Sequence, residues 1–92
     1  MVKKFYYVYV LQSLKDNKFY IGYSAEVDRR VLEHQRGENV STAKRLPMIL
    51  VFYEAYLSKK DALRREKYFK TTKGKTTLRQ MIRETLVESQ TH

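Results

Sequence analysis

Residues 5–11 read FYYVYVL and residues 18–23 read KFYIGY, and the prediction of the fold starts from these two runs. Both are dense in aromatic and β-branched residues, which favour strands, and both are too short and bulky to suggest helices. Between them, Asp16 and Asn17 are residue types that adopt turn conformations readily. The two runs are therefore predicted to pair as a β-hairpin.

The periodicity changes from strand-like to helical after this hairpin. A helix is predicted from Ser24 or Ala25 to about Gln35, with Ser24 as its N-cap and Gly37 near its C-terminal end. Residues 38–45 are polar and carry no strong signal, so they are predicted to form a loop.

A third strand and two further helices follow. The strand is predicted at residues 48–56, and a helix over residues 59–70 begins after a capping-box pattern at Ser58. Residues 71–75 (TTKGK) are predicted to break that helix, and apolar residues repeating at three and four predict a last helix over about 77–87.

The predicted fold class is α+β, a three-stranded antiparallel β-sheet flanked by helices. The 92 residues suffice for a single domain, 1–92, whose core is expected to span about residues 5–75. The chain has no cysteine, which excludes disulfides, thiolate zinc sites and cysteine nucleophiles. Without a signal peptide or an apolar run near the roughly 20 residues that span a bilayer, a cytoplasmic protein is expected.

The charge balance indicates a polyanionic partner. Lys and Arg number 19 against 10 Asp and Glu, a formal net charge of +9. Solubility alone is the alternative explanation, but the excess is large for so small a domain, which favours nucleic acid. A membrane surface is not favoured, because no predicted helix is both strongly basic and broadly apolar on its other face.

Two basic residues share a predicted helix face with apolar ones. At 100° per residue, Arg30 and His34 fall on the same stripe as Val27 and Val31. Their side chains can lie at the edge of the stripe and point outward, or they can form an anion pocket. In the second case, Arg offers a planar fork that matches phosphate, and His can move a proton near neutral pH.

A carboxylate stands in the apolar side of the second predicted helix. Glu66 lies among Ala62, Leu63 and Phe69, where a carboxylate needs a partner. That partner can be Mg²⁺, which takes one or two carboxylates with water and phosphate oxygen, or a basic residue such as Arg30. The residues alone favour neither explanation.

Tyrosine is concentrated on the predicted hairpin. The chain has 8 Tyr and no Trp. Most of these rings are expected to pack on the sheet, although one or two hydroxyls can reach the same cleft as Arg30 and Glu66. Gly22, at the end of the second predicted strand, would let substrate or backbone approach closely.

Taken in order, these residues form a recognisable set. Its members are Tyr7-Val8-Tyr9, Tyr20-Ile21-Gly22, Arg30, His34 and Glu66. The set resembles the GIY-YIG nuclease family over about residues 5–75, and especially its short single-domain members, which are related to the excinuclease nuclease domain. Tyr7 and Val8 replace the leading glycine and isoleucine of the first motif, and both residues suit a strand.

The resemblance implies hydrolysis of phosphodiester bonds with one Mg²⁺ or Mn²⁺ ion. Glu66 would hold the metal, and Arg30 would neutralise charge on the phosphate. Tyr9 or Tyr20 would position or deprotonate the attacking water, and His34 would contact phosphate or relay a proton. Which tyrosine serves as the base is left open.

The resemblance also implies a nucleic-acid surface, formed by Ser41, Thr42 and Lys44 in the loop after the first helix. The function expected is an endonuclease acting on DNA rather than RNA, in repair or recombination. The alternative is a non-catalytic nucleic-acid-binding module, in which basic residues such as Lys67 and Lys73 contact phosphates. Membership of a larger repair complex is a further alternative.

Overall fold

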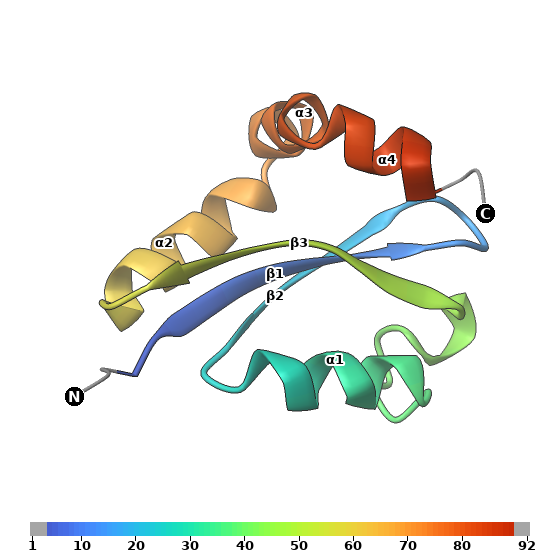
Figure 1. Ribbon diagram of the computed structural model, residues 1–92, viewed down its shortest axis with the longest axis horizontal. Coiled ribbons are helices and arrows are strands. Elements are labelled where there is room, and N and C mark those ends of the chain that lie inside the picture. Colours follow the sequence, from blue (N-terminus) through green and yellow to red (C-terminus); the bar gives the residue numbers. More distant parts are fainter. Residues whose placement is uncertain (1–3, 90–92) are drawn as a thin grey trace.

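Strand β1 lies at the centre of a three-stranded antiparallel sheet with the order β2-β1-β3 (Figure 1). The computed structural model describes residues 4–89. The strands are β1 (Tyr6–Ser13), β2 (Phe19–Ser24) and β3 (Met48–Tyr56). The predicted hairpin, third strand and α+β class are therefore confirmed.

The helices cover the two faces of the sheet unequally. Helix α1 (Val27–Gln35) lies on one face, and α2 (Lys59–Phe69), α3 (Thr72–Met81) and α4 (Arg83–Ser89) lie on the other (Figure 1). Within residues 4–89, none of these helices has the length and apolar character that a membrane crossing requires.

Strand β1 is buried on both faces, so the molecule has two small cores. Val8 and Val10 pack with Phe69 and Leu78 beneath α2 and α3. The alternate residues of the same strand, Tyr9 and Leu11, form the second core with Val31 and Met48, beneath α1. Burial of each large side chain contributes about 1.5–3 kcal/mol. Because side chains alternate along a strand, this one segment contributes to both cores.

The first helix begins later than predicted. Ser24 is the last residue of β2, and its hydroxyl accepts a hydrogen bond of 2.9 Å from the backbone N–H of Glu26. The helix begins at Val27, after this turn. The prediction of Ser24 as the N-cap was wrong, although its side chain does satisfy a backbone donor just before the helix. The predicted loop of residues 38–45 contains one short 3₁₀ turn, η1 (Ala43–Arg45).

Helix α2 ends just before residues 71–75, as predicted, but Thr71 caps a new helix and residues 72–75 form its first turn. The hydroxyl of Thr71 accepts a hydrogen bond of 2.9 Å from the N–H of Gly74 and caps α3. Gly74 is buried, and a Cβ there would lie 1.9 Å from the carbonyl oxygen of Tyr68. The glycine therefore allows α2 and α3 to approach closely and does not interrupt the helix.

The predicted helix of residues 77–87 was likewise wrong, because the chain bends at Ile82 and forms two helices. Ile82 is buried in the core beneath α2 and α3 and has a non-helical backbone conformation. The second helix was correctly predicted, and the hydroxyl of its N-cap, Ser58, accepts a hydrogen bond from the N–H of Asp61.

Candidate active site

A buried chain of three polar side chains links β1, α1 and the loop after α1. The Tyr9 hydroxyl lies 3.1 Å from Nε2 of His34, and Nδ1 of the same ring lies 2.7 Å from the Thr42 hydroxyl. His34 and Thr42 are completely buried, and Tyr9 is 2% exposed. Both ring nitrogens of His34 therefore have partners, which fix the orientation of the imidazole.

Gly22 provides the space for the Tyr9 ring. The two residues are partners in the β1–β2 ladder, and a Cβ on Gly22 would lie 2.4 Å from both Cζ and Oη of Tyr9. Gly22 lies within β2 and not at its end, and the Tyr9 ring makes the close approach there. The glycine thus lets the phenol extend over the edge strand β2.

Tyr20 is the second tyrosine of the site and is partly exposed. Its ring centroid lies 4.6 Å from that of His34 and 6.4 Å from that of Tyr9. His34 is therefore in contact with two tyrosine rings, of which Tyr9 is buried and Tyr20 reaches solvent.

Burial controls the protonation of this pair. It raises the pKa of Tyr9 far above that of a free phenol; Tyr20 and Glu66 act in the same direction, and Arg30 opposes them. Burial also lowers the pKa of His34, assisted by the positive charge of Arg30 and opposed by Glu33. At neutral pH the site therefore holds a protonated phenol beside a neutral imidazole.

Arg30 lies at the edge of the apolar stripe, with its side chain 40% exposed. Its Nε is nevertheless buried and has no hydrogen-bond partner among the described residues. The Glu33 carboxylate lies 3.7 Å away, which is too far for a hydrogen bond. A buried N–H without an acceptor is costly, so Arg30 has an unfilled capacity to bind an anion.

Glu66 projects from the buried side of α2, with its side chain 19% exposed. Its carboxylate pairs with Lys70 at 3.1 Å, one helical turn away. The ion pair with Arg30 that the sequence left open is not formed. Glu66 raises the pKa of Tyr9 and Arg30 lowers it, although α2 and α1, which carry these two residues, lie on opposite faces of the sheet (Figure 1).

The predicted nucleic-acid contacts divide into exposed and buried residues. Ser41, Lys44, Lys67 and Lys73 are exposed and remain available to a ligand. Thr42 is completely buried against His34, so the prediction that it contacts nucleic acid directly was wrong. Sequence reasoning missed its role as the hydrogen-bond partner of His34, and nothing in the polar loop sequence distinguishes it from its neighbours.

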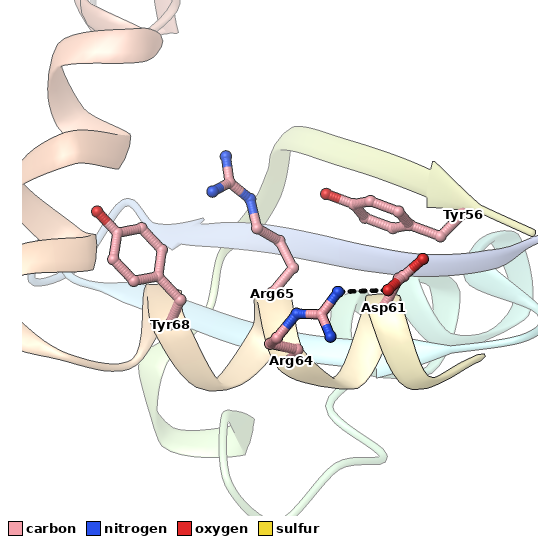
Figure 2. A pocket seen from close by; sticks show the side chains of 5 residues that line it. All are labelled: Tyr56, Asp61, Arg64, Arg65 and Tyr68. Carbon is pink, nitrogen blue, oxygen red and sulfur yellow. Dashed lines mark hydrogen bonds and ion pairs between the residues drawn. The ribbon is translucent and has the colours of Figure 1, made fainter. Parts of the chain in front are cut away.

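A separate pocket lies beside α2, away from these residues. Figure 2 shows its lining, and its volume is about 490 Å³; the residues are Tyr56, Asp61, Arg64, Arg65 and Tyr68. Each of its arginines is already paired, Arg64 with Asp61 and Arg65 with Glu54. Because these charges are balanced, the pocket has the character of a structural ion-pair network.

Comparisons with known proteins find relatives of this chain in both sequence and structure. The sequence model of the GIY-YIG catalytic domain matches residues 5–80. A UPF0213 protein of Staphylococcus haemolyticus is 40% identical over 72% of this chain and 80% of its own length. One from Lacticaseibacillus paracasei is 42% identical over 76% of this chain and 79% of its own. The solution NMR structure of a UPF0213 protein from Bacillus halodurans matches with a TM-score of 0.54 and 36% identity, covering 84% of each chain.

Proposed function

The chain belongs to the family of the GIY-YIG catalytic domain, a nuclease family, and on that premise we propose that it is a metal-dependent endonuclease. Its substrate would be the phosphodiester backbone of DNA, in a repair or recombination context. The observation that carries the proposal is the buried Tyr9–His34–Thr42 chain, with Arg30 one helical turn before His34 and its Nε without a hydrogen-bond partner among the described residues.

The proton path of the proposed reaction begins at Tyr9. Because its pKa is strongly raised, this tyrosine is a poor base by itself. Neutral His34 can serve as the final proton acceptor. The attacking water would give a proton to Oη of Tyr9, while the Tyr9 hydroxyl proton passes to Nε2 of His34. Nδ1–H of His34 would then donate to Thr42 and hold the ring in the required tautomer. Tyr20, at the exposed side of His34, would position the water.

Arg30 would bind the phosphate at which the water attacks. Its buried Nε lacks an acceptor, and a phosphate oxygen would supply one. The guanidinium would stabilise charge that develops on the phosphate, an effect that is often the largest single contribution to such catalysis.

Glu66 is the residue that would hold a divalent ion. Residues 4–89 contain no group of three or more His, Asp or Glu side chains that could bind a metal together. One carboxylate nonetheless suits Mg²⁺ or Mn²⁺, because water and phosphate oxygen fill the other positions. Lys70, its present partner, is more than half exposed and can turn away. When bound, the metal would act as a Lewis acid on the phosphate and the leaving oxygen.

The decisive experiment measures nicking of supercoiled and branched DNA with Mg²⁺ or Mn²⁺. Arg30→Ala and Glu66→Gln should abolish nicking while circular dichroism and thermal unfolding show an intact fold. Arg29→Ala is the matched control on the same helix, because Arg29 is exposed and already pairs with Glu26. Lys70→Ala tests whether the Glu66 partner is dispensable. If the wild-type protein nicks none of these substrates with either ion, the nuclease proposal fails.

A non-catalytic nucleic-acid-binding module is the alternative, and the Glu66–Lys70 ion pair favours it, because a lysine already neutralises the carboxylate. Glu66→Gln separates the two functions. In a binding module this change would leave DNA affinity unchanged or increase it, and the wild-type protein would have no nicking activity to lose.

A further inference from the structure

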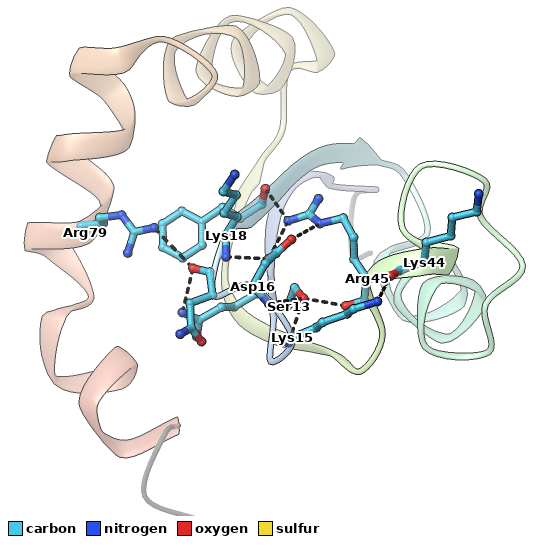
Figure 3. Close-up of polar contacts among 10 residues, drawn as sticks. Ser13, Lys15, Asp16, Lys18, Lys44, Arg45 and Arg79 are labelled. Carbon is cyan, nitrogen blue, oxygen red and sulfur yellow. Dashed lines mark hydrogen bonds and ion pairs between the residues drawn. The ribbon is translucent and has the colours of Figure 1, made fainter.

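Cationic side chains from three separate segments line one pocket beside the β1–β2 turn. The pocket has a volume of about 210 Å³, and its residues are Lys18, Phe19, Arg45, Lys75 and Arg79. Lys18 and Phe19 follow the hairpin turn, Arg45 ends η1, and the other two belong to α3. Figure 3 shows Lys18 between Arg79 on one side and Arg45 on the other.

We propose that this pocket binds a phosphate group of the nucleic-acid strand, away from the bond that is cleaved. The inference rests on the proposed function, which supplies the polyanion. It adds a second anchor for the substrate, at the end of the sheet where the β1–β2 turn lies.

The charges of the pocket are only partly compensated. Asp16 pairs with Arg45 at 3.0 Å. Within residues 4–89, neither Lys18 nor Lys75 takes part in an ion pair. Lys75 and Arg79 are also one helical turn apart on α3, a like-charge spacing that weakens a helix. The remaining like charges repel one another, and a bound anion would relieve that repulsion.

Both guanidinium groups of the pocket are held in place before any ligand arrives. Arg79 lies over the Phe19 ring, with its Cζ 4.3 Å from the centroid. Arg45 is fixed by Asp16 and donates to the Phe19 carbonyl at 3.4 Å. Guanidinium groups whose motion is already restricted lose less conformational entropy on binding an oxyanion than unrestrained lysine side chains do. The pocket therefore combines two fixed guanidinium groups with two exposed lysines.

The position of the pocket on β2 favours nucleic acid as the source of the phosphate. Lys18 precedes Gly22 by four residues, which span about 13 Å of an extended strand. This distance corresponds to about four nucleotide steps of 3.4 Å along a duplex. β2 is an edge strand of the sheet, so one nucleic-acid strand following that edge would pass both the pocket and Tyr20, the partly exposed tyrosine of the candidate site.

The test compares two double variants that remove the same charge. Lys18→Gln with Lys75→Gln removes the two lysine charges of the pocket. Lys59→Gln with Lys60→Gln removes two exposed lysines from the start of α2. Binding to a fluorescent duplex of about 20 base pairs is measured by anisotropy from about 50 to 200 mM salt, in EDTA so that no cleavage occurs.

The pocket variant should bind about tenfold or more weakly near 100 mM salt, and the slope of log affinity against log salt should become shallower by about 1.8. The control variant should lose less than about threefold in duplex affinity, because it weakens only the overall positive electrostatic field of the protein. Equal losses in the two variants would overturn the proposal, because a diffuse positive surface would then explain binding.

Titration with inorganic phosphate, followed by NMR at the backbone amides of Lys18 and Lys75, distinguishes the source of the anion. Shifts with phosphate, combined with unchanged duplex affinity in the pocket variant, would overturn the nucleic-acid assignment in favour of a small-anion site. Failure of the nuclease proposal would look different. The wild-type protein would bind DNA through the pocket, and the pocket variant would bind weakly, but no nicking would occur with any metal.

Discussion

The phenol of Tyr9 lies against the α-carbon of Gly22 so closely that a methyl group there would come within 2.4 Å of Cζ and Oη. The hydroxyl on that ring is the group that contacts His34. The geometry of the candidate site thus depends on a missing side chain in the neighbouring strand.

Gly22→Ala should therefore displace Tyr9 and disturb both stability and activity. Overpacking of this kind costs about 1–3 kcal/mol of unfolding free energy, measured by urea denaturation. Nicking should fall more than about tenfold, because a displaced hydroxyl loses its alignment with His34. In a Tyr9→Val background, where no ring occupies the space, the same substitution should be nearly neutral for stability. An equal cost in both backgrounds would show that Gly22 is required for another reason.

Thr42→Val should weaken the support of His34 without leaving a cavity. The hydroxyl lost is the partner of Nδ1 at 2.7 Å in a fully buried position. The unpaired ring nitrogen should cost about 1–3 kcal/mol, and nicking should fall by about tenfold, equivalent to about 1.4 kcal/mol of lost positioning. Thr42→Ser retains the hydroxyl and should recover most of the activity. No recovery with Ser would mean that Thr42 acts through packing alone.

Stability should decline as the pH falls below about 6.5. His34 has a lowered pKa in the folded protein, so the unfolded chain takes up a proton first. The contribution of His34 is therefore complete above about pH 7, decreases as the pH falls through the unfolded value near 6.5, and levels off below the folded pKa. Urea unfolding at several pH values between about 8 and 5.5 measures this slope, which His34→Gln should largely remove. A wild-type protein that becomes more stable over this interval would contradict the assignment.

Arg65→Ala should destabilise the fold without affecting catalysis. Arg65 pairs with Glu54 at 2.9 Å, and its Cζ lies 4.3 Å from the centre of the Phe69 ring. Lost packing and a Glu54 carboxylate that keeps only the Tyr56 hydroxyl as its donor should cost about 1–3 kcal/mol. The neighbouring Arg64 is 75% exposed, so Arg64→Ala should change stability by no more than about 0.5 kcal/mol. A nicking rate that fell with Arg65→Ala at an unchanged melting temperature would assign the pocket of Figure 2 to the reaction.

The strands and the second helix could be predicted because their signals are local. Aromatic and β-branched runs define β1 and β2, and Ser58 marks the start of α2. Gly74 was misinterpreted because a glycine in a helix costs about 1 kcal/mol relative to alanine when judged from the sequence alone. The close approach to Tyr68 that makes glycine necessary there exists only once two helices have packed together.

The candidate site could also be predicted in part from the sequence. Helical spacing correctly placed His34 on the buried face of α1. The partner of Glu66 could also have been inferred, because Lys70 follows it by four residues, the spacing of a helical ion pair. The contact between Thr42 and His34 could not, since it depends on how an irregular loop folds back onto α1.

Because β1 separates two cores of different character, the stability of the fold and the reactivity of the site can be changed independently by substitution. The core beneath α2 and α3 is built largely of hydrocarbon, around Val8, Phe69 and Leu78, and tolerates volume-conserving exchange. The core beneath α1 includes the phenol and borders the imidazole, so any change there alters a reactive group as well as the packing. Substitutions that raise the stability of the protein are best sought in the first core, and substitutions that alter its reactivity in the second.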